Sequence, residues 1–141
     1  MFYGALNDRR RSVLLTLQEK GLNVQAVFTY GAERDEMISR AKVILNVHYY
    51  IPAVLEVARL GYLWANRKAV VSELNESTEL APGLEACCIY APYENLVNAL
   101  LYLLKNKARR EELEQRAFDD FSRLKQEDFL RPVVGGKNKS I

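Results

Sequence analysis

A glycine and three consecutive arginines near the start of the chain suit a phosphate group. Gly4 ends an apolar run, Asn7 follows, and Arg9, Arg10 and Arg11 come next. If a helix begins here, its backbone amides and one guanidinium fork would hold a diphosphate. Consecutive helical residues point in different directions, so we expect one arginine to face the ligand. The competing interpretation is a solvated basic turn.

Polar aromatic residues follow the most apolar run of the chain. His48, Tyr49 and Tyr50 come directly after residues 43–47, a buried-strand pattern. Such side chains stack on and hydrogen-bond to a sugar or a base. His48 is the only histidine of the chain, and the alternative for it is a structural hydrogen-bonding role.

Three charged residues further along are also candidates. Glu56 and Arg59 are three residues apart in an apolar helical pattern, so we expect them on one face, either paired with each other or contacting a ligand. The alternative is a salt bridge on the outer surface. Glu73 ends a predicted strand, where its carboxylate would reach ribose hydroxyls; otherwise it is an ordinary loop acid.

Several kinds of site are missing from the sequence. We find neither the six-residue glycine fingerprint of dinucleotide sites nor a phosphate-binding loop ending in Gly-Lys-Ser/Thr. Metal-spaced His/Cys clusters, paired catalytic carboxylates and a nucleophile elbow are also absent. Hydride transfer, nucleoside triphosphate hydrolysis and metal-dependent hydrolysis therefore lack their usual motifs.

Strands and helices alternate in the pattern. We predict strands over residues 1–6, 24–28, 43–47, 68–72 and 87–90. We predict helices over residues 9–20, 32–40, 52–66, 92–105 and 107–129, with Pro52 in a first helical turn. Residues 73–83 are expected to be irregular.

This alternation predicts the fold class α/β: a three-layer α/β/α Rossmann-like lobe with a mainly parallel sheet of about five strands. Ligands of such sheets bind beyond the carboxyl ends of the strands. We therefore expect the site among the loops after Gly4, Tyr30, Val47 and Ser72. Residues 1–130 should form one lobe and residues 131–141 a disordered tail.

Composition restricts the partners. The 141 residues include 20 Lys or Arg and 18 Asp or Glu, for a net charge of +2, which gives no broad field for a nucleic acid or an anionic membrane. Cys87 and Cys88 are adjacent, so a disulfide between them is disfavoured. Without a signal peptide or a spanning run in the pattern, we expect a cytoplasmic protein; peripheral membrane association stays open.

Two stretches resemble a known family. Residues 41–48, followed by residues 59–73, are similar to the donor-binding lobe of two-lobed (GT-B) glycosyltransferases, particularly the branch related to spore-maturation glycosyltransferases. There, a strand like ADVVLN precedes a helix like RxFEALAxG and a strand ending in Thr/Ser-Glu. Arg59, Ala65, Ser72 and Glu73 fall on matching places. Two residues depart from the family pattern: Tyr62 stands where the family often has a ribose-binding glutamate, and Arg67 replaces a common glycine before the fourth strand. Residues 89–104 and 109–113 resemble the end of the same lobe.

The resemblance implies that the chain binds a nucleotide sugar, UDP- or GDP-linked, without a metal or other cofactor. It implies donor contacts from Gly4, Asn7, Arg9, Arg10, His48, Tyr49, Glu56, Arg59, Ser72 and Glu73. Glu56 or Glu73 would replace the missing ribose-binding glutamate. An acceptor lobe would precede residue 1, so we expect an excised or truncated piece that does not transfer sugar alone; no catalytic residue is assigned.

Two other functions remain open from the sequence. The first is a non-catalytic α/β nucleotide-binding or interaction module. Its receiver-like form needs an acidic pair after the first strand and an aspartate ending the third, and here Gly4-Ala5 and Asn46-Val47 occupy those places. The second is a remnant lobe that packs against a partner and binds no ligand.

Overall fold

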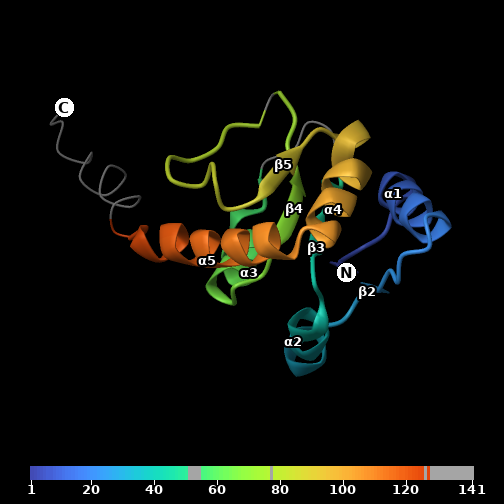
Figure 1. The fold of residues 1–141 in the computed structure, drawn as a ribbon, viewed down its shortest axis with the longest axis horizontal. Helices are drawn as coiled ribbons and strands as arrows, with labels where there is room; N and C mark the ends of the chain where they lie inside the picture. The colour runs from blue at the N-terminus through green and yellow to red at the C-terminus, as the bar shows by residue number, and fades with distance from the viewer. Residues whose placement is uncertain (51–54, 77, 126, 128–141) are drawn as a thin grey trace, which may run out of the picture.

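The structure is a computed structural model that describes residues 1–50, 55–76, 78–125 and 127. Strands and helices alternate as predicted (Figure 1). In chain order the elements are β1 (Phe2–Tyr3), α1 (Asp8–Glu19), β2 (Ala26–Val27), α2 (Gly31–Arg40), β3 (Ile44–Asn46), α3 (Val57–Ala65), β4 (Val70–Glu73), β5 (Ile89–Ala91), the 3-10 turn η1 (Tyr93–Asn95), α4 (Leu96–Lys105) and α5 (Lys107–Arg123).

The α/β class and the parallel pairing are confirmed, but the predicted single sheet of about five strands is wrong. β1 pairs with β2 in one parallel sheet, and β3, β4 and β5 form a second. The sheets meet between β1 and β3, where the Leu45 N–H donates to the Met1 carbonyl at 2.9 Å. β1 and β2 have two residues each, which is too short to continue the ladder. All five strands nevertheless direct their carboxyl ends to one edge.

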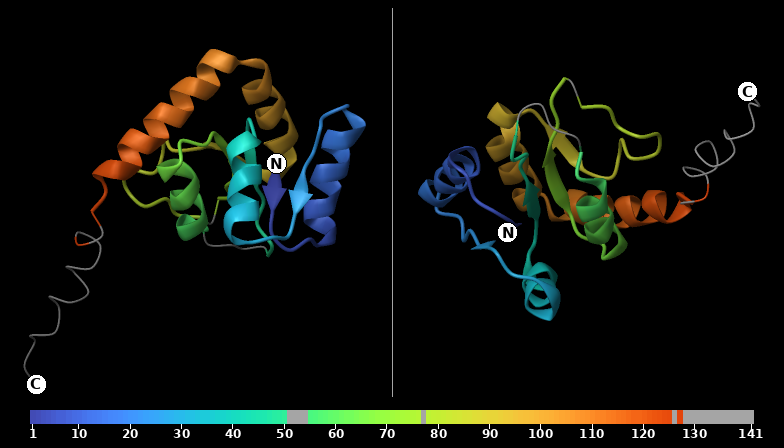
Figure 2. Two further views of the ribbon diagram at one scale, coloured as in Figure 1. Left: turned by 90° about the horizontal axis from the view of Figure 1, so that it is seen from below. Right: turned by 180° about the vertical axis from the view of Figure 1, so that it is seen from behind.

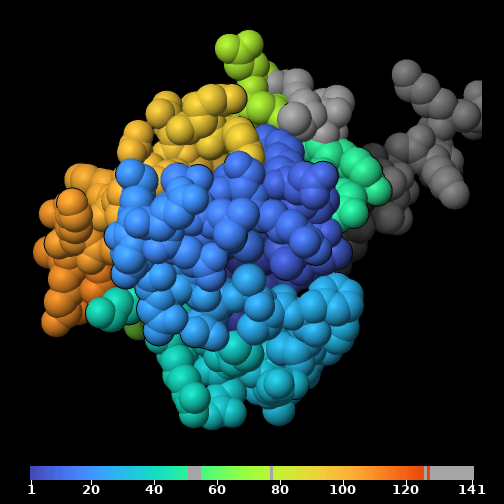
Figure 3. All heavy atoms as spheres, turned by 90° about the vertical axis from the view of Figure 1, so that its right-hand side faces the viewer, coloured from blue at the N-terminus to red at the C-terminus, as the bar shows by residue number. Residues whose placement is uncertain are grey.

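Helices cover both faces of the strands, which gives the predicted three layers (Figures 1 and 2). Successive side chains of a strand point to opposite faces, so Leu45 and Val71 pack under α1 and α4. Ile44 and Val70 pack with α2, α3 and α5 on the other side. Seen from the α1 side, α1 and the chain that follows it cover the strands, with α2 and α4 beside them (Figure 3).

Several predicted boundaries were wrong. α3 begins at Val57, not residue 52, because Leu55 and Glu56 are not helical. The predicted helical turn at Pro52 falls outside the described residues, as does the tail of residues 131–141. β1 is confined to Phe2–Tyr3 because Gly4 has a φ of 126°, which ends the extended run.

The end of the chain also differs from the prediction in its boundaries. α5 ends at Arg123, and α4 begins only after η1. β4 extends to Glu73. β5 starts at Ile89, so Cys87 and Cys88 precede it, both buried and unbridged.

Candidate functional site

The N-terminus of α1 is capped by Asn7 and tied by the same side chain to the loop after β3. The Asn7 Oδ1 accepts from the Arg10 N–H at 3.0 Å, as an N-cap does. The Asn7 Nδ2 donates to the Tyr49 carbonyl at 2.8 Å. Asn7 therefore positions both the start of α1 and the loop of Tyr49 and Tyr50 after β3.

Arg9 is bound to Glu73 at the end of β4. The Arg9 Nη1 lies 2.6 Å from Glu73 Oε2, and Arg9 Nη2 contacts Oε1, so the pair is bidentate. The guanidinium also lies 3.9 Å from the centre of the Tyr93 ring, whose hydroxyl donates to the Arg9 carbonyl at 2.8 Å. The hydrogen bonds to Glu73 raise the pKa of Arg9. Glu73 itself is 1% exposed, so its carboxylate faces Arg9, not solvent.

Arg10 is buried and its donors are mostly used by backbone oxygens. The Arg10 Nε donates to the Val47 carbonyl at 2.9 Å, and Nη1 donates to the Ala5 carbonyl at 2.8 Å. The Arg10 Nη2 lies 3.8 Å from Glu56 Oε1. Burial lowers the pKa of Arg10, and the neighbouring charge of Arg59 lowers it further. Arg10 thus joins α1 to the carboxyl end of β3 while remaining a cation.

Arg59, from α3, lies close to Arg10 and to the end of β1. Its guanidinium stacks 4.0 Å from the centre of the Tyr3 ring, and Nη2 donates to the Tyr3 carbonyl. The Arg59 Nε is buried and has no hydrogen-bond partner among the described residues. Within those residues no carboxylate lies within 4.0 Å of Arg59. Burial lowers its pKa, so an incoming anion would stabilise its charged form.

Gly4 is the point at which Arg10 and Arg59 converge. A β-carbon at Gly4 would lie 3.4 Å from Arg59 Nη1 and 3.9 Å from Arg10 Nη1. The φ of 126° is a conformation that glycine adopts without strain. The missing side chain therefore leaves the backbone of this turn close to two guanidinium groups.

The arginines of this edge are not equally paired with carboxylates. Three arginines, at positions 9, 10 and 59, face two carboxylates, Glu56 and Glu73. Arg59 is the one of the three that has no carboxylate within 4.0 Å among the described residues, and it is half-buried, where water screens charge poorly. Such a place favours an anionic ligand.

Asn46, His48, Glu56 and Ser72 form a polar cluster beneath the arginines. The Asn46 Nδ2 donates to Glu56 Oε2 at 2.8 Å and to Ser72 Oγ at 3.1 Å. The His48 Nδ1 lies 3.2 Å from Glu56 Oε2, but the contact is poorly aligned, so both ring nitrogens count as unpaired. Burial opposes ionisation of Glu56, but the nearby His48 ring and the hydrogen bond from Asn46 outweigh it, so the pKa of Glu56 is lowered.

The structure brings the ten predicted donor-site residues to one edge but at two depths. His48 and Ser72 are fully buried, and Arg10 and Glu73 nearly so, which places these four under the surface. Gly4, Asn7, Arg9, Tyr49, Glu56 and Arg59 are half-buried. Only these and the exposed Tyr50 offer surface to a ligand without rearrangement.

Of the alternatives for Glu56 and Arg59, the ion pair between them is not formed. Glu56 and Arg59 do not pair along a helix face, because Glu56 precedes α3 as its N-cap residue. Its carboxylate turns toward Arg10, Asn46 and His48. We expected one of the three consecutive arginines to turn toward the ligand site. In the structure both Arg9 and Arg10 turn inward, and Arg11 is exposed.

Two residues that contact the predicted site residues, Asn46 and Tyr93, were not candidates in the sequence. Asn46 is the one polar residue in the apolar run of residues 43–47 and is completely buried. An amide at the end of a buried strand needs partners, and that signal would have identified it. Tyr93 follows Pro92 after β5, and no local pattern connects it with Arg9.

The described residues contain neither a metal-binding cluster nor a membrane-spanning helix. No group of three or more His, Cys, Asp or Glu side chains is placed to hold a metal ion there. None of the helices in these ranges is both long and apolar enough to cross a membrane.

Comparison with known proteins gives one distant likeness. No protein-family model and no solved structure matches the chain. An uncharacterised protein of Acanthamoeba polyphaga mimivirus is 32% identical over 111 residues, which cover 74% of this chain and 12% of the viral protein. The chain thus spans only a small part of that relative, whose description names no activity. Function is therefore inferred from the site itself.

Proposed function

We propose that this chain binds the diphosphate of a nucleotide sugar and serves as the donor-binding lobe of a glycosyltransferase. The observation that carries the proposal is the approach of Arg10 and Arg59 to Gly4, with no carboxylate within 4.0 Å of Arg59 among the described residues. A diphosphate would supply the anionic partner that Arg59 lacks, next to the Arg59 Nη1 and Arg10 Nη1 atoms that approach Gly4. The start of α1, with its positive dipole end, lies at the same edge.

The remaining half-buried residues suit the rest of a sugar nucleotide. The rings of Tyr49 and Tyr50 lie edge to face with centres 4.6 Å apart, and Tyr50 is 73% exposed. We assign this pair to stacking on the UDP or GDP base. The Glu56 side chain is 31% exposed, so it, not Glu73, is available to accept from ribose hydroxyls.

Sugar transfer is proposed only for an assembly that adds an acceptor lobe. In that assembly the arginines would stabilise the leaving diphosphate as negative charge develops on it. This step asks for no proton transfer from the residues named here. The proposal is supported by the resemblance of residues 41–48 and 59–73 and by the site's place at the carboxyl ends of the strands.

A non-catalytic α/β module is the second candidate, and one observation favours it. Arg9 is held by both oxygens of Glu73, and Arg10 donates to two backbone carbonyls. Those contacts satisfy two of the three arginines without any ligand. In this alternative, the cluster holds α1 on the sheet and the partner is another protein.

Titration of the whole chain with UDP, GDP and their sugars, followed by NMR, separates these functions. The donor-lobe proposal predicts shifts at Gly4, Arg59 and Tyr49, and at least tenfold weaker binding in Arg59→Gln. Arg40→Gln removes an equal charge from an exposed place on α2 and should bind as the wild type does. No shift with any nucleotide at millimolar concentration would exclude the donor function and leave the module. Equal loss in both variants would indicate nonspecific charge attraction.

A further inference from the structure

An apolar groove runs between α3 and α5 on the face opposite α1 and α4. It has a volume of about 800 Å³, and its walls include Ala58 and Ala65 of α3, Leu84, and Phe121 and Leu124 at the end of α5. Figure 2 shows the two helices crossing there. Ala58 and Ala65 are exposed, and the nearby Val57 is 40% exposed. An apolar hollow of this kind marks a place where another segment binds.

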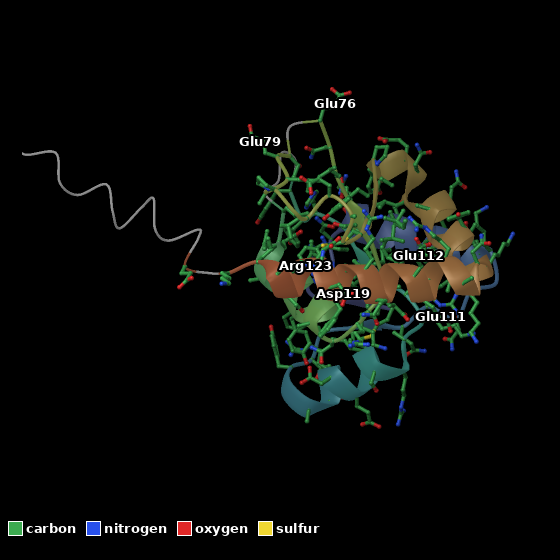
Figure 4. All side chains as sticks on the ribbon, turned by 60° about the vertical axis from the view of Figure 1, so that its left-hand side comes forward. Glu76, Glu79, Glu111, Glu112, Asp119 and Arg123 are labelled. Atoms are coloured by element: carbon green, nitrogen blue, oxygen red, sulfur yellow. The ribbon has the colours of Figure 1, made fainter. Side chains whose placement is uncertain are left out.

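The side of α5 that faces α3 is apolar, and its polar residues lie on the other side. Glu111, Glu112, Asp119 and Arg123 lie on the outer side of α5 (Figure 4). Its inner side carries Leu113, Ala117 and Phe121, which pack into the cores.

The chain leaves α5 at the groove itself. Leu124 follows α5 and lines the groove, with its Cδ2 3.1 Å from the place of a β-carbon on Gly83. Phe129 and Leu130 are the next two large apolar residues along the chain. Five residues span at most about 17 Å, whereas Ala58 and Ala65 are about 10 Å apart along their helix. The segment between Leu124 and Phe129 is therefore long enough for Phe129 and Leu130 to contact any part of the groove.

The charge of residues 74–86, beside the groove, is opposite to the charge of residues 129–141. Ala81 and Leu84 line the groove, and residues 74–86, the stretch of sequence that contains them, carry Glu76, Glu79 and Glu85 and no basic residue. All three glutamates are exposed, and Figure 4 shows Glu76 and Glu79 projecting from this loop. Residues 129–141 carry three basic residues and no acidic one.

We propose that the end of this chain docks back into the α3/α5 groove, with Phe129 and Leu130 against Ala58 and Ala65. The basic residues from Arg131 onward then lie near the glutamates of residues 74–86. A tethered segment has a local concentration on the order of millimolar, so it occupies the groove ahead of a second copy of the chain. This surface is separate from the arginine cluster and does not depend on the nucleotide proposal.

Amide hydrogen exchange on the full chain tests the docking. Phe129 and Leu130 should exchange at least tenfold more slowly than an unstructured peptide. Ala58→Asp puts a carboxylate into the groove and should return both amides to unstructured rates. Ala32→Asp is the matched control, since both alanines are exposed and occupy the second position of their helices, α3 and α2. It should leave the protection unchanged.

Two results would overturn the docking. Unstructured rates at Phe129 and Leu130 in the wild type would show an empty groove. Protection that rises with protein concentration, together with a dimer in sedimentation, would show that a second copy fills it. Phe129→Ser with Leu130→Ser changes only the docking segment, so it tests the same idea if Ala58→Asp fails to fold. This double variant should bind more of a hydrophobic dye than the wild type, and unchanged dye binding would count against the docking.

Discussion

Glu73 holds Arg9 with both carboxylate oxygens and also accepts from the His48 N–H at 2.9 Å. One side chain thus connects α1, the end of β4 and the loop after β3, which are separated by up to 64 positions in sequence. Glu73 is 1% exposed and the Arg9 side chain 17% exposed, so water replaces these bonds poorly. This pair organises the edge where the candidate site lies.

Glu73→Gln should destabilise the fold. The variant keeps the shape but leaves the Arg9 charge without its partner, and breaking a largely buried pair costs about 2–4 kcal/mol. Urea denaturation of the wild type, of Glu73→Gln, of Arg9→Gln and of the double variant measures this. A coupling energy above about 1 kcal/mol is expected for residues in direct contact. Additive effects would mean that the pair contributes little.

The order of elements was predictable, whereas the contacts within the site were not. Hydrophobic periodicity identified the strand at residues 43–47 and the helices around it, because those patterns are local. Parallel strands then bring Gly4, His48 and Glu73 to one edge whatever their side chains do. The arginine that pairs with Glu56 is Arg10, 46 positions away. This pairing depends on the three-dimensional fold and has no local signal in the sequence.

Strand lengths were overestimated for a related reason. Residues 1–6 read as one apolar run, but Gly4 has a φ of 126°, outside the range of regular strands, and the strand ends at Tyr3. Helix α3 was predicted too early because Leu55 and Glu56 continue the helical pattern of residues 57–65. The hydrogen bonds of Glu56 to Asn46 and its contact with Arg10 fix it outside the helix. Tertiary contacts of this kind override periodicity.

Gly4→Ala should weaken nucleotide binding and lower stability. The φ of 126° disfavours any residue with a β-carbon, and that carbon would lie in contact with Arg59 Nη1, at 3.4 Å, where the ligand is proposed to bind. Gly21→Ala is the control, since Gly21 has a φ of 78° and open space where its β-carbon would lie. We expect both variants to lose about 1–2 kcal/mol of unfolding free energy, and only Gly4→Ala to lose nucleotide affinity. Equal nucleotide affinity in the two would move the binding site away from this turn.

Stability should fall at high pH because of Cys88. Burial raises the pKa of its thiol from 9.0 to about 12. Above pH 9 the unfolded chain loses this proton while the folded chain keeps it, so the unfolding free energy decreases as pH rises toward 12. The decrease is about 1.4 kcal/mol per pH unit for one such group.

Cys88→Ala isolates that contribution. Its unfolding free energy, measured in urea at pH 8, 9, 10 and 11, should fall less steeply than that of the wild type. The slope is the informative quantity, because the lost sulfur changes packing equally at every pH. Parallel slopes would mean that the thiol ionises as easily in the folded protein as in the unfolded chain.

Gly61 should be the least replaceable small residue of α3. A β-carbon there would lie 2.7 Å from Cζ of Phe121, and that ring also packs on Trp64 with centres 5.4 Å apart. Gly61→Ala therefore forces α3 and α5 apart and should cost about 1–3 kcal/mol, even though alanine is the better helix former. Adding Phe121→Leu makes room for the new methyl group, so the double variant should lose less than the sum of the two single losses. If Gly61→Ala alone were stabilising, the close approach of the two helices at this point would be wrong.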